Sequence, residues 1–108
     1  MEFGLSEKTS GIMKKFFSGF PEIEEVKIFG SRAKGGYKKG SDIDFALYGD
    51  IGFRLLSEIA SAIDELPTPY KYDITDYRTI ENQDLKEHID RTGKTFYRRS
   101  VLNTTETV

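Results

Sequence analysis

The 108-residue sequence contains no cysteine and no tryptophan, and it has only three prolines and one histidine. Without cysteine, the chain can form neither a disulfide nor a thiolate metal site. This absence suits a reducing compartment, so we expect a cytoplasmic protein. No apolar run reaches the roughly 20 residues of a membrane-spanning helix, and the N-terminus lacks the apolar stretch of a signal peptide. We therefore expect a soluble protein that has no membrane-embedded part.

An excess of positive charge is also missing. The chain has 16 lysines and arginines against 18 aspartates and glutamates, a net charge of −2. Nucleic-acid-binding domains are usually basic, so general binding to nucleic acid is not expected. The length suits one domain, which we place over residues 1–100. Residues 101–108 show no periodic pattern, and we expect a disordered tail there.

Apolar periodicity predicts helices that alternate with strands. Ser6 is expected to cap the first helix and Asp50 the second. Because only a loop joins the first two strands, we expect that pair to be antiparallel. The fold class is α/β in the wide sense (α+β), with a small mixed sheet and helices packed on one face. The expected helices span about residues 6–21, 50–66 and 82–91, with one turn starting at residue 31; the expected strands span 24–30, 41–49, 70–77 and 94–98.

A glycine-rich basic loop separates the first two expected strands, in the stretch FGSRAKGGYKKGSDIDFAL. Gly30 ends a strand and Ser31 opens a helical turn, so free backbone N–H groups and a hydroxyl converge. Such a turn suits a phosphate group. Arg32 and Lys34 lie closest to this point and are further candidates. A plain flexible loop with solubilising lysines is the alternative, and it is the better explanation for Lys38 and Lys39.

Paired carboxylates follow this loop directly. Asp42 and Asp44 are two residues apart on an expected strand, so their side chains lie on one face about 6–7 Å apart. Oxygen ligands at this spacing suit Mg²⁺ or Mn²⁺. The alternative is an ordinary solvated sheet face. The next strand favours the metal site, because its alternation places Asp73 on the same side and Asp76 on the opposite side. Three carboxylates on one face would repel one another without a cation.

This arrangement resembles the polymerase-beta-like nucleotidyltransferases, whose pattern is Gly-Ser-x-Ala-x-Gly, a five-residue spacer and Ser-Asp-x-Asp. The resemblance runs from about Val26 to Tyr97, nearly the whole chain. At this size the chain is most similar to the minimal nucleotidyltransferases, which commonly pair with a helical HEPN-domain protein and in several cases act as antitoxins that add AMP to it. The residues in register are Gly30, Ser31, Ala33, Gly35, Ser41, Asp42 and Asp44.

The resemblance implies a two-metal phosphoryl-transfer site. Asp42, Asp44 and Asp73 would be the catalytic residues and the ligands of two Mg²⁺ ions, with Mn²⁺ as a substitute. ATP would be the substrate, and pyrophosphate would leave as AMP is transferred to a hydroxyl group. Asp73 would also help to deprotonate that hydroxyl. The implied nucleotide-binding residues are Gly30, Ser31, Arg32, Lys34, Gly35 and Ser41.

Three functions remain open at the level of sequence. The first is an enzyme that adds a nucleoside monophosphate to a partner protein, expected to be a HEPN-domain protein. The second is a catalytically silent subunit that neutralises such a partner by binding alone. The third, transfer to an RNA or antibiotic hydroxyl, lacks an acceptor-binding domain and fits the acidic net charge poorly. A homodimer or mixed complex is also expected. His88, the only histidine, is interpreted as an ordinary helical residue.

Overall fold

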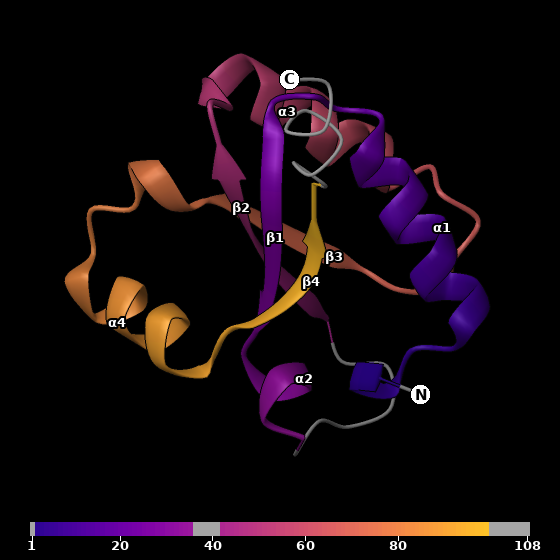
Figure 1. The fold of residues 1–108 in the computed structure, drawn as a ribbon, viewed down its shortest axis with the longest axis horizontal. Helices are drawn as coiled ribbons and strands as arrows, with labels where there is room; N and C mark the ends of the chain where they lie inside the picture. Colours follow the sequence, from indigo (N-terminus) through magenta and orange to yellow (C-terminus); the bar gives the residue numbers. More distant parts are fainter. Residues whose placement is uncertain (1, 36–41, 100–108) are drawn as a thin grey trace, which may run out of the picture.

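The structure, a computed structural model, describes residues 2–35 and 42–99 (Figure 1). Residues 36–41, which include the predicted site residue Ser41, and the expected tail lie outside the described part. Helices and strands alternate in the predicted order, with two short 3₁₀ helices added. The elements are η1 (Glu2–Gly4), α1 (Glu7–Ser18), β1 (Ile23–Phe29), α2 (Ser31–Lys34), β2 (Ile43–Gly49), α3 (Gly52–Ile63), β3 (Tyr72–Asp76), η2 (Tyr77–Thr79), α4 (Gln83–Thr92) and β4 (Lys94–Arg98).

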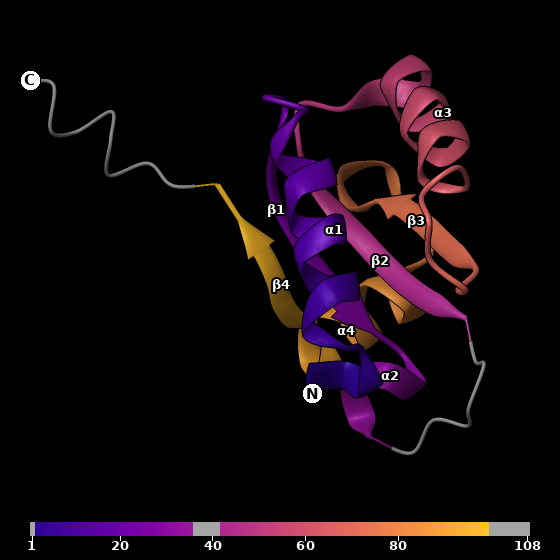
Figure 2. The same cartoon turned by 90° about the vertical axis from the view of Figure 1, so that its right-hand side faces the viewer.

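The four strands form one mixed sheet in the order β3-β2-β1-β4. β1 pairs antiparallel with β2 on one side and with β4 on the other, whereas β2 and β3 run parallel. Figure 2 shows the strands side by side, with β4 and β3 at the two edges. The mixed α+β fold class and the antiparallel pairing around the basic loop are both confirmed.

The main core lies between one sheet face and the helices α1 and α3. Ser6 caps α1 as predicted, since its hydroxyl oxygen accepts a hydrogen bond from the backbone N–H of Thr9 at 3.1 Å. Phe17 from α1 is fully buried, and its ring packs edge-on against that of Phe45, with 5.2 Å between the centroids. Burial of these apolar side chains is the main stabilising contribution of this layer.

The helices cover both faces of the sheet, which corrects the expectation that they all pack on one. α4 lies against the opposite face, where Ile89 packs with Phe29 and Ala46 in a second, smaller cluster. Figure 1 shows α1 and α4 on either side of the strands. Asn82 caps α4 by accepting a hydrogen bond from the N–H of Leu85 at 3.1 Å. α4 therefore covers part of the sheet face that was expected to be polar and uncovered.

The predicted cap of α3 is wrong. The N-cap residue is Ile51, without a side-chain hydrogen bond, and the chain turns through a positive φ of 74° at Gly52 before it becomes helical. Asp50 instead lies 3.6 Å from the guanidinium group of Arg78. Across residues 2–35 and 42–99, none of the helices combines the length and apolar character that crossing a membrane requires.

Candidate active site

Two aspartates meet at the start of the parallel strand pair. Asp44 of β2 and Asp73 of β3 are partners in the register of that pair. Asp42 immediately precedes β2, two residues before Asp44. The intervening Ile43 is fully buried in the core, so Asp42 and Asp44 emerge on the other face. Asp73 was predicted to lie on the same side of the sheet as Asp44, and its position opposite Asp44 in the strand pair agrees with this. The structure places all three aspartates at one end of the sheet.

The pKa of Asp44 reflects the charges of the neighbouring aspartates. Burial raises the pKa of the Asp44 carboxyl group above its ordinary value, and the neighbouring charges of Asp73 and then Asp42 raise the pKa further. His88 acts in the opposite direction and lowers the pKa of Asp44. Both aspartates are thus close enough to repel Asp44, and ionised Asp44 is held at an energetic cost.

The oxygen-rich cluster fits a divalent cation in its chemistry. Mg²⁺ and Mn²⁺ prefer carboxylate oxygens, and a cation would reverse the repulsion that raises the pKa of Asp44. Among the described residues, no three histidine, aspartate or glutamate side chains lie close enough together to hold a metal ion. The residues therefore provide the ligand type, and binding would require the carboxylates to converge.

Gly30 brings the turn before α2 directly against Asp44. Its φ is +77°, a conformation that side-chain-bearing residues rarely adopt. A Cβ atom at this position would lie 2.6 Å from Oδ2 of Asp44. The backbone of Ser31 and Lys34 follows in α2, so the first N–H groups of this turn begin next to the acidic cluster. Glycine is required here both for the turn and for the approach of the carboxylate.

Of the remaining predicted nucleotide-binding residues, Gly35 is exposed and Arg32 is buried. Gly35 follows α2 at a φ of +96° and is exposed, and no atom of the described residues lies within 4 Å of the position that a Cβ would take. Arg32 is buried, with only 3% of its surface exposed. Its guanidinium group donates a hydrogen bond to the carbonyl oxygen of Phe3 at 3.1 Å. The side chain predicted to bind nucleotide thus packs inside the protein.

His88 is the residue at this site whose position the sequence did not indicate. It lies on α4, half-buried, and its ring stands edge-on to that of Phe29 with 6.2 Å between the centroids. Its influence on the pKa of Asp44 shows that it borders the acidic cluster. The periodic stripe of Leu85 and Ile89 predicts an amphipathic helix. It does not predict which sheet face that helix covers, so this neighbour could not be assigned.

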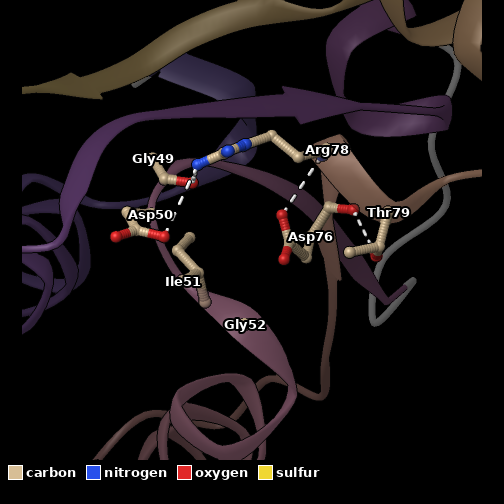
Figure 3. Close-up of a pocket in the computed structure, with 7 residues that line it drawn as sticks. All are labelled: Gly49, Asp50, Ile51, Gly52, Asp76, Arg78 and Thr79. Carbon is tan, nitrogen blue, oxygen red and sulfur yellow. Dashed lines mark hydrogen bonds and ion pairs between the residues drawn. The ribbon is translucent and has the colours of Figure 1, made fainter.

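A cleft of about 240 Å³ lies at the other end of β2 and β3 (Figure 3). Asp76 lines it, is 3% exposed and accepts a hydrogen bond from the backbone N–H of Arg78. Asp76 was predicted to lie on the opposite side of the sheet from Asp73. This agrees with the register of the parallel pair, in which Asp76 lies beside the buried Leu47 of β2. The cleft is separate from the acidic cluster, which lies where the same two strands begin. Its lining residues are Gly49, Asp50, Ile51, Gly52, Asp76, Arg78 and Thr79.

Comparison with known structures supports the same fold. A toxin–antitoxin crystal structure with AMP-PNP aligns at 22% identity and a TM-score of 0.62, covering 89% of this chain and 78% of the other. A tri-AMPylated HEPN toxin in complex with an MNT antitoxin, from Shewanella oneidensis, aligns at 20% identity and a TM-score of 0.58, covering 95% and 79%. A proposed nucleotidyltransferase from Sulfolobus solfataricus aligns at 25% identity and a TM-score of 0.54, covering 84% and 78%.

A comparison with curated proteins finds no match. The family model described as "Polymerase beta, Nucleotidyltransferase" matches residues 12–101, which include every described strand and the acidic cluster. The glycine turn, the paired aspartates at the start of β2 and the facing aspartate on β3 all lie within this range. The chain therefore belongs to the polymerase beta nucleotidyltransferase family.

Proposed function

We propose that the protein transfers AMP from ATP to a hydroxyl group of a partner protein in a Mg²⁺-dependent reaction. The observation that carries this proposal is the contact between the glycine turn and the acidic pair. Gly30 approaches Asp44 so closely that a Cβ atom would not fit, and Asp44 faces Asp73 across the parallel strands. A phosphate-binding turn and a cation-binding cluster at one point are what a metal-bound triphosphate requires.

Each residue has a separate task in the proposed reaction. Asp42 and Asp44 would hold Mg²⁺, or Mn²⁺ in its place, and Asp73 would complete a second cation position. The bound cations would neutralise charge on the triphosphate oxygens. Asp73 would accept the proton of the attacking hydroxyl. The hydroxyl oxygen then bonds to the α-phosphorus while the bond to the bridging oxygen breaks and pyrophosphate leaves.

The turn that starts at Gly30 would hold the triphosphate. Backbone N–H groups around Ser31 and its hydroxyl would bind the β- and γ-phosphates. Lys34 and Ser41 remain proposed contacts. Gly35, exposed and free of neighbours at its Cβ position, would let the backbone approach the nucleotide. Arg32 is buried, and a positioning role is proposed for it instead of a contact with the nucleotide.

The proposed acceptor is a HEPN-domain protein. Two of the similar structures are toxin–antitoxin complexes, and in one of them the HEPN toxin carries AMP groups. By analogy, this chain would act as an antitoxin that modifies a hydroxyl of its toxin partner. The chain's net charge of −2 fits a protein acceptor better than a nucleic acid acceptor.

The alternative function, a catalytically silent subunit that neutralises its partner by binding alone, has one observation in its favour. Within the described ranges, no three acidic or histidine side chains are close enough for a cation. A subunit that neutralises its partner by contact alone would not need to bring them closer. The raised pKa of Asp44 argues against this alternative, because an acidic cluster without a cation costs stability.

The test uses ATP labelled at the α-phosphate, Mg²⁺ and a co-purified partner protein. The proposed function predicts label on the partner with the wild-type chain and none with Asp44→Asn. The control is Asp50→Asn, which changes an exposed aspartate at the opposite end of β2 and should leave labelling intact. A stable but unlabelled complex would favour the contact-only function, and wild-type turnover by Asp44→Asn would refute the assignment of the site.

A further inference from the structure

Arg32 is a buried cation beside the candidate phosphate turn. It belongs to α2, the four-residue helix that follows Gly30, and 3% of its surface is exposed. A buried guanidinium group must be compensated by hydrogen bonds and neighbouring rings, because its removal from water is costly. The two contacts described below come from distant parts of the chain.

The first contact ties α2 to the N-terminal segment. Nη1 of Arg32 donates a hydrogen bond to the carbonyl oxygen of Phe3 at 3.1 Å, across 29 residues of sequence. Phe3 has a φ of 58° and a ψ of 21°, a left-handed conformation that is uncommon for a residue other than glycine. Its ring lies 6.4 Å from that of Phe96 between centroids, and the nearby Leu5 is 1% exposed. The N-terminal segment is thus anchored in the core.

The second contact ties α2 to the segment before β3. The Arg32 guanidinium carbon lies 5.1 Å from the centre of the Tyr70 ring, a cation–π arrangement. Tyr70 precedes β3 by two residues and Asp73 by three. One side chain therefore contacts both the N-terminal segment and the residues that lead into the strand with the third aspartate.

We propose that Arg32 is a positioning residue that fixes α2, and with it the phosphate turn, against the N-terminal segment and the start of β3. It does so from inside the protein and does not contact the nucleotide. The consequence for nucleotide binding rests on the proposed function. The N-terminal segment is then part of the apparatus that holds the triphosphate site in shape, although it lies outside the Gly-Ser motif.

The test compares four variants of the full chain by amide hydrogen exchange without nucleotide and by titration with ATP. Arg32→Met keeps an apolar stem but removes the contacts with the Phe3 carbonyl and the Tyr70 ring, and Tyr70→Leu removes the ring alone. Phe3→Pro cannot adopt a positive φ, so it displaces the carbonyl oxygen. Phe3→Asn is its matched control, because it also lacks the ring but tolerates the left-handed conformation.

We expect faster exchange in a peptide covering residues 29–35 for Arg32→Met, Tyr70→Leu and Phe3→Pro, and a smaller change for Phe3→Asn. Exchange within β2 should stay at its wild-type rate, because the effect is local. The Kd for ATP should rise by about tenfold in Arg32→Met, because the turn that binds the triphosphate is no longer held in place before binding. The KM for ATP should rise with little change in kcat, whereas a loss of folded protein would lower kcat alone.

The proposal is overturned if Arg32→Met weakens ATP binding while exchange over residues 29–35 and the Phe3→Pro variant both behave as wild type. That result would make Arg32 a direct nucleotide ligand. Unchanged exchange in all variants would overturn it as well. If the wild-type chain bound no ATP, the proposed function would fail, but the exchange measurements would still decide whether Arg32 holds α2.

Discussion

Asp44 and Asp73 face each other across the only parallel strand pair among the described strands. Parallel pairing means that both strands begin at the same end of the sheet, so the two carboxylates are held side by side by backbone hydrogen bonds. The charge of Asp73 contributes to the raised pKa of Asp44. The fold therefore holds two carboxylates that repel each other, and a bound cation would relieve this repulsion.

Asp44→Asn should make the protein more stable at neutral pH while it abolishes transfer. The pKa of Asp44 is raised in the folded protein from an ordinary 3.8, so ionised Asp44 destabilises the fold. This cost is absent below the unfolded pKa, grows as the pH rises towards the folded pKa, and is fully present above it. Thermal unfolding at a series of pH values should show a higher Tm for the variant at pH 7 and no advantage in acid. An equal or lower Tm at pH 7 would contradict the electrostatic assignment.

Divalent cations should stabilise the wild-type chain. Binding to the folded state adds about 2.7 kcal/mol at a concentration one hundred times the Kd. We expect Mg²⁺ or Mn²⁺ to raise the Tm of the wild type and to have no effect on Asp73→Asn. The matched control is Asp50→Asn, which also loses one carboxylate but from a side chain that is 99% exposed. A response retained by Asp73→Asn would place the cation elsewhere.

Gly30→Ala should impair the site more than the fold. A left-handed conformation costs a residue with a Cβ about 1–2 kcal/mol, and the new atom would lie 2.6 Å from Oδ2 of Asp44. Because that oxygen is at the end of a side chain, it can move aside, and the cation response and transfer are then lost. Gly52→Ala has the same backbone strain, with a φ of +74°, but nothing in the described part of the chain lies within 4 Å of its Cβ position. Comparable unfolding free energies for both variants, with loss of the cation response only in Gly30→Ala, would support this assignment.

Phe17→Ala should be strongly destabilising. Phe17 is fully buried, and its ring lies 5.2 Å from that of Phe45 and 6.3 Å from that of Phe96 between centroids. Removing such a side chain costs about 3–5 kcal/mol of unfolding free energy. Phe53→Ala removes the same side chain from a position that is 85% exposed and should change stability by less than about 0.5 kcal/mol. Urea denaturation of both variants measures the difference.

The strands and the acidic face could be predicted because alternation has a fixed period. Ile43, Phe45 and Leu47 are all fully buried, so the intervening Asp44 emerges on the other face as expected. The same alternation predicted Asp73 on the same side of the sheet as Asp44, and the two residues are partners in the parallel strand pair. The Ser6 cap was also predictable, because a serine before an apolar stripe is a local signal.

The placement of α4 and of Arg32 could not be predicted, because both depend on distant partners. Leu85 and Ile89 define an apolar stripe, but a stripe does not specify which sheet face it covers. Arg32 lies in a motif that resembles a phosphate loop, yet its hydrogen-bond acceptor is a backbone carbonyl 29 residues away. The Asp50 cap was wrong for a local reason, since α3 starts at Gly52 with a positive φ and Ile51 takes the N-cap position.

The position of β1 in the sheet bears on how the protein is made. β1 is synthesised early, but one of its two neighbours, β4, is the last of the described strands, and Glu25 pairs with Arg98 across 73 residues. During translation, one side of this nascent strand stays without its partner until residue 98 has been added. Pairing over such a separation is slow, and an unpaired strand invites association with other chains. This edge of the growing polypeptide is therefore exposed to aggregation until β4 can pair with it.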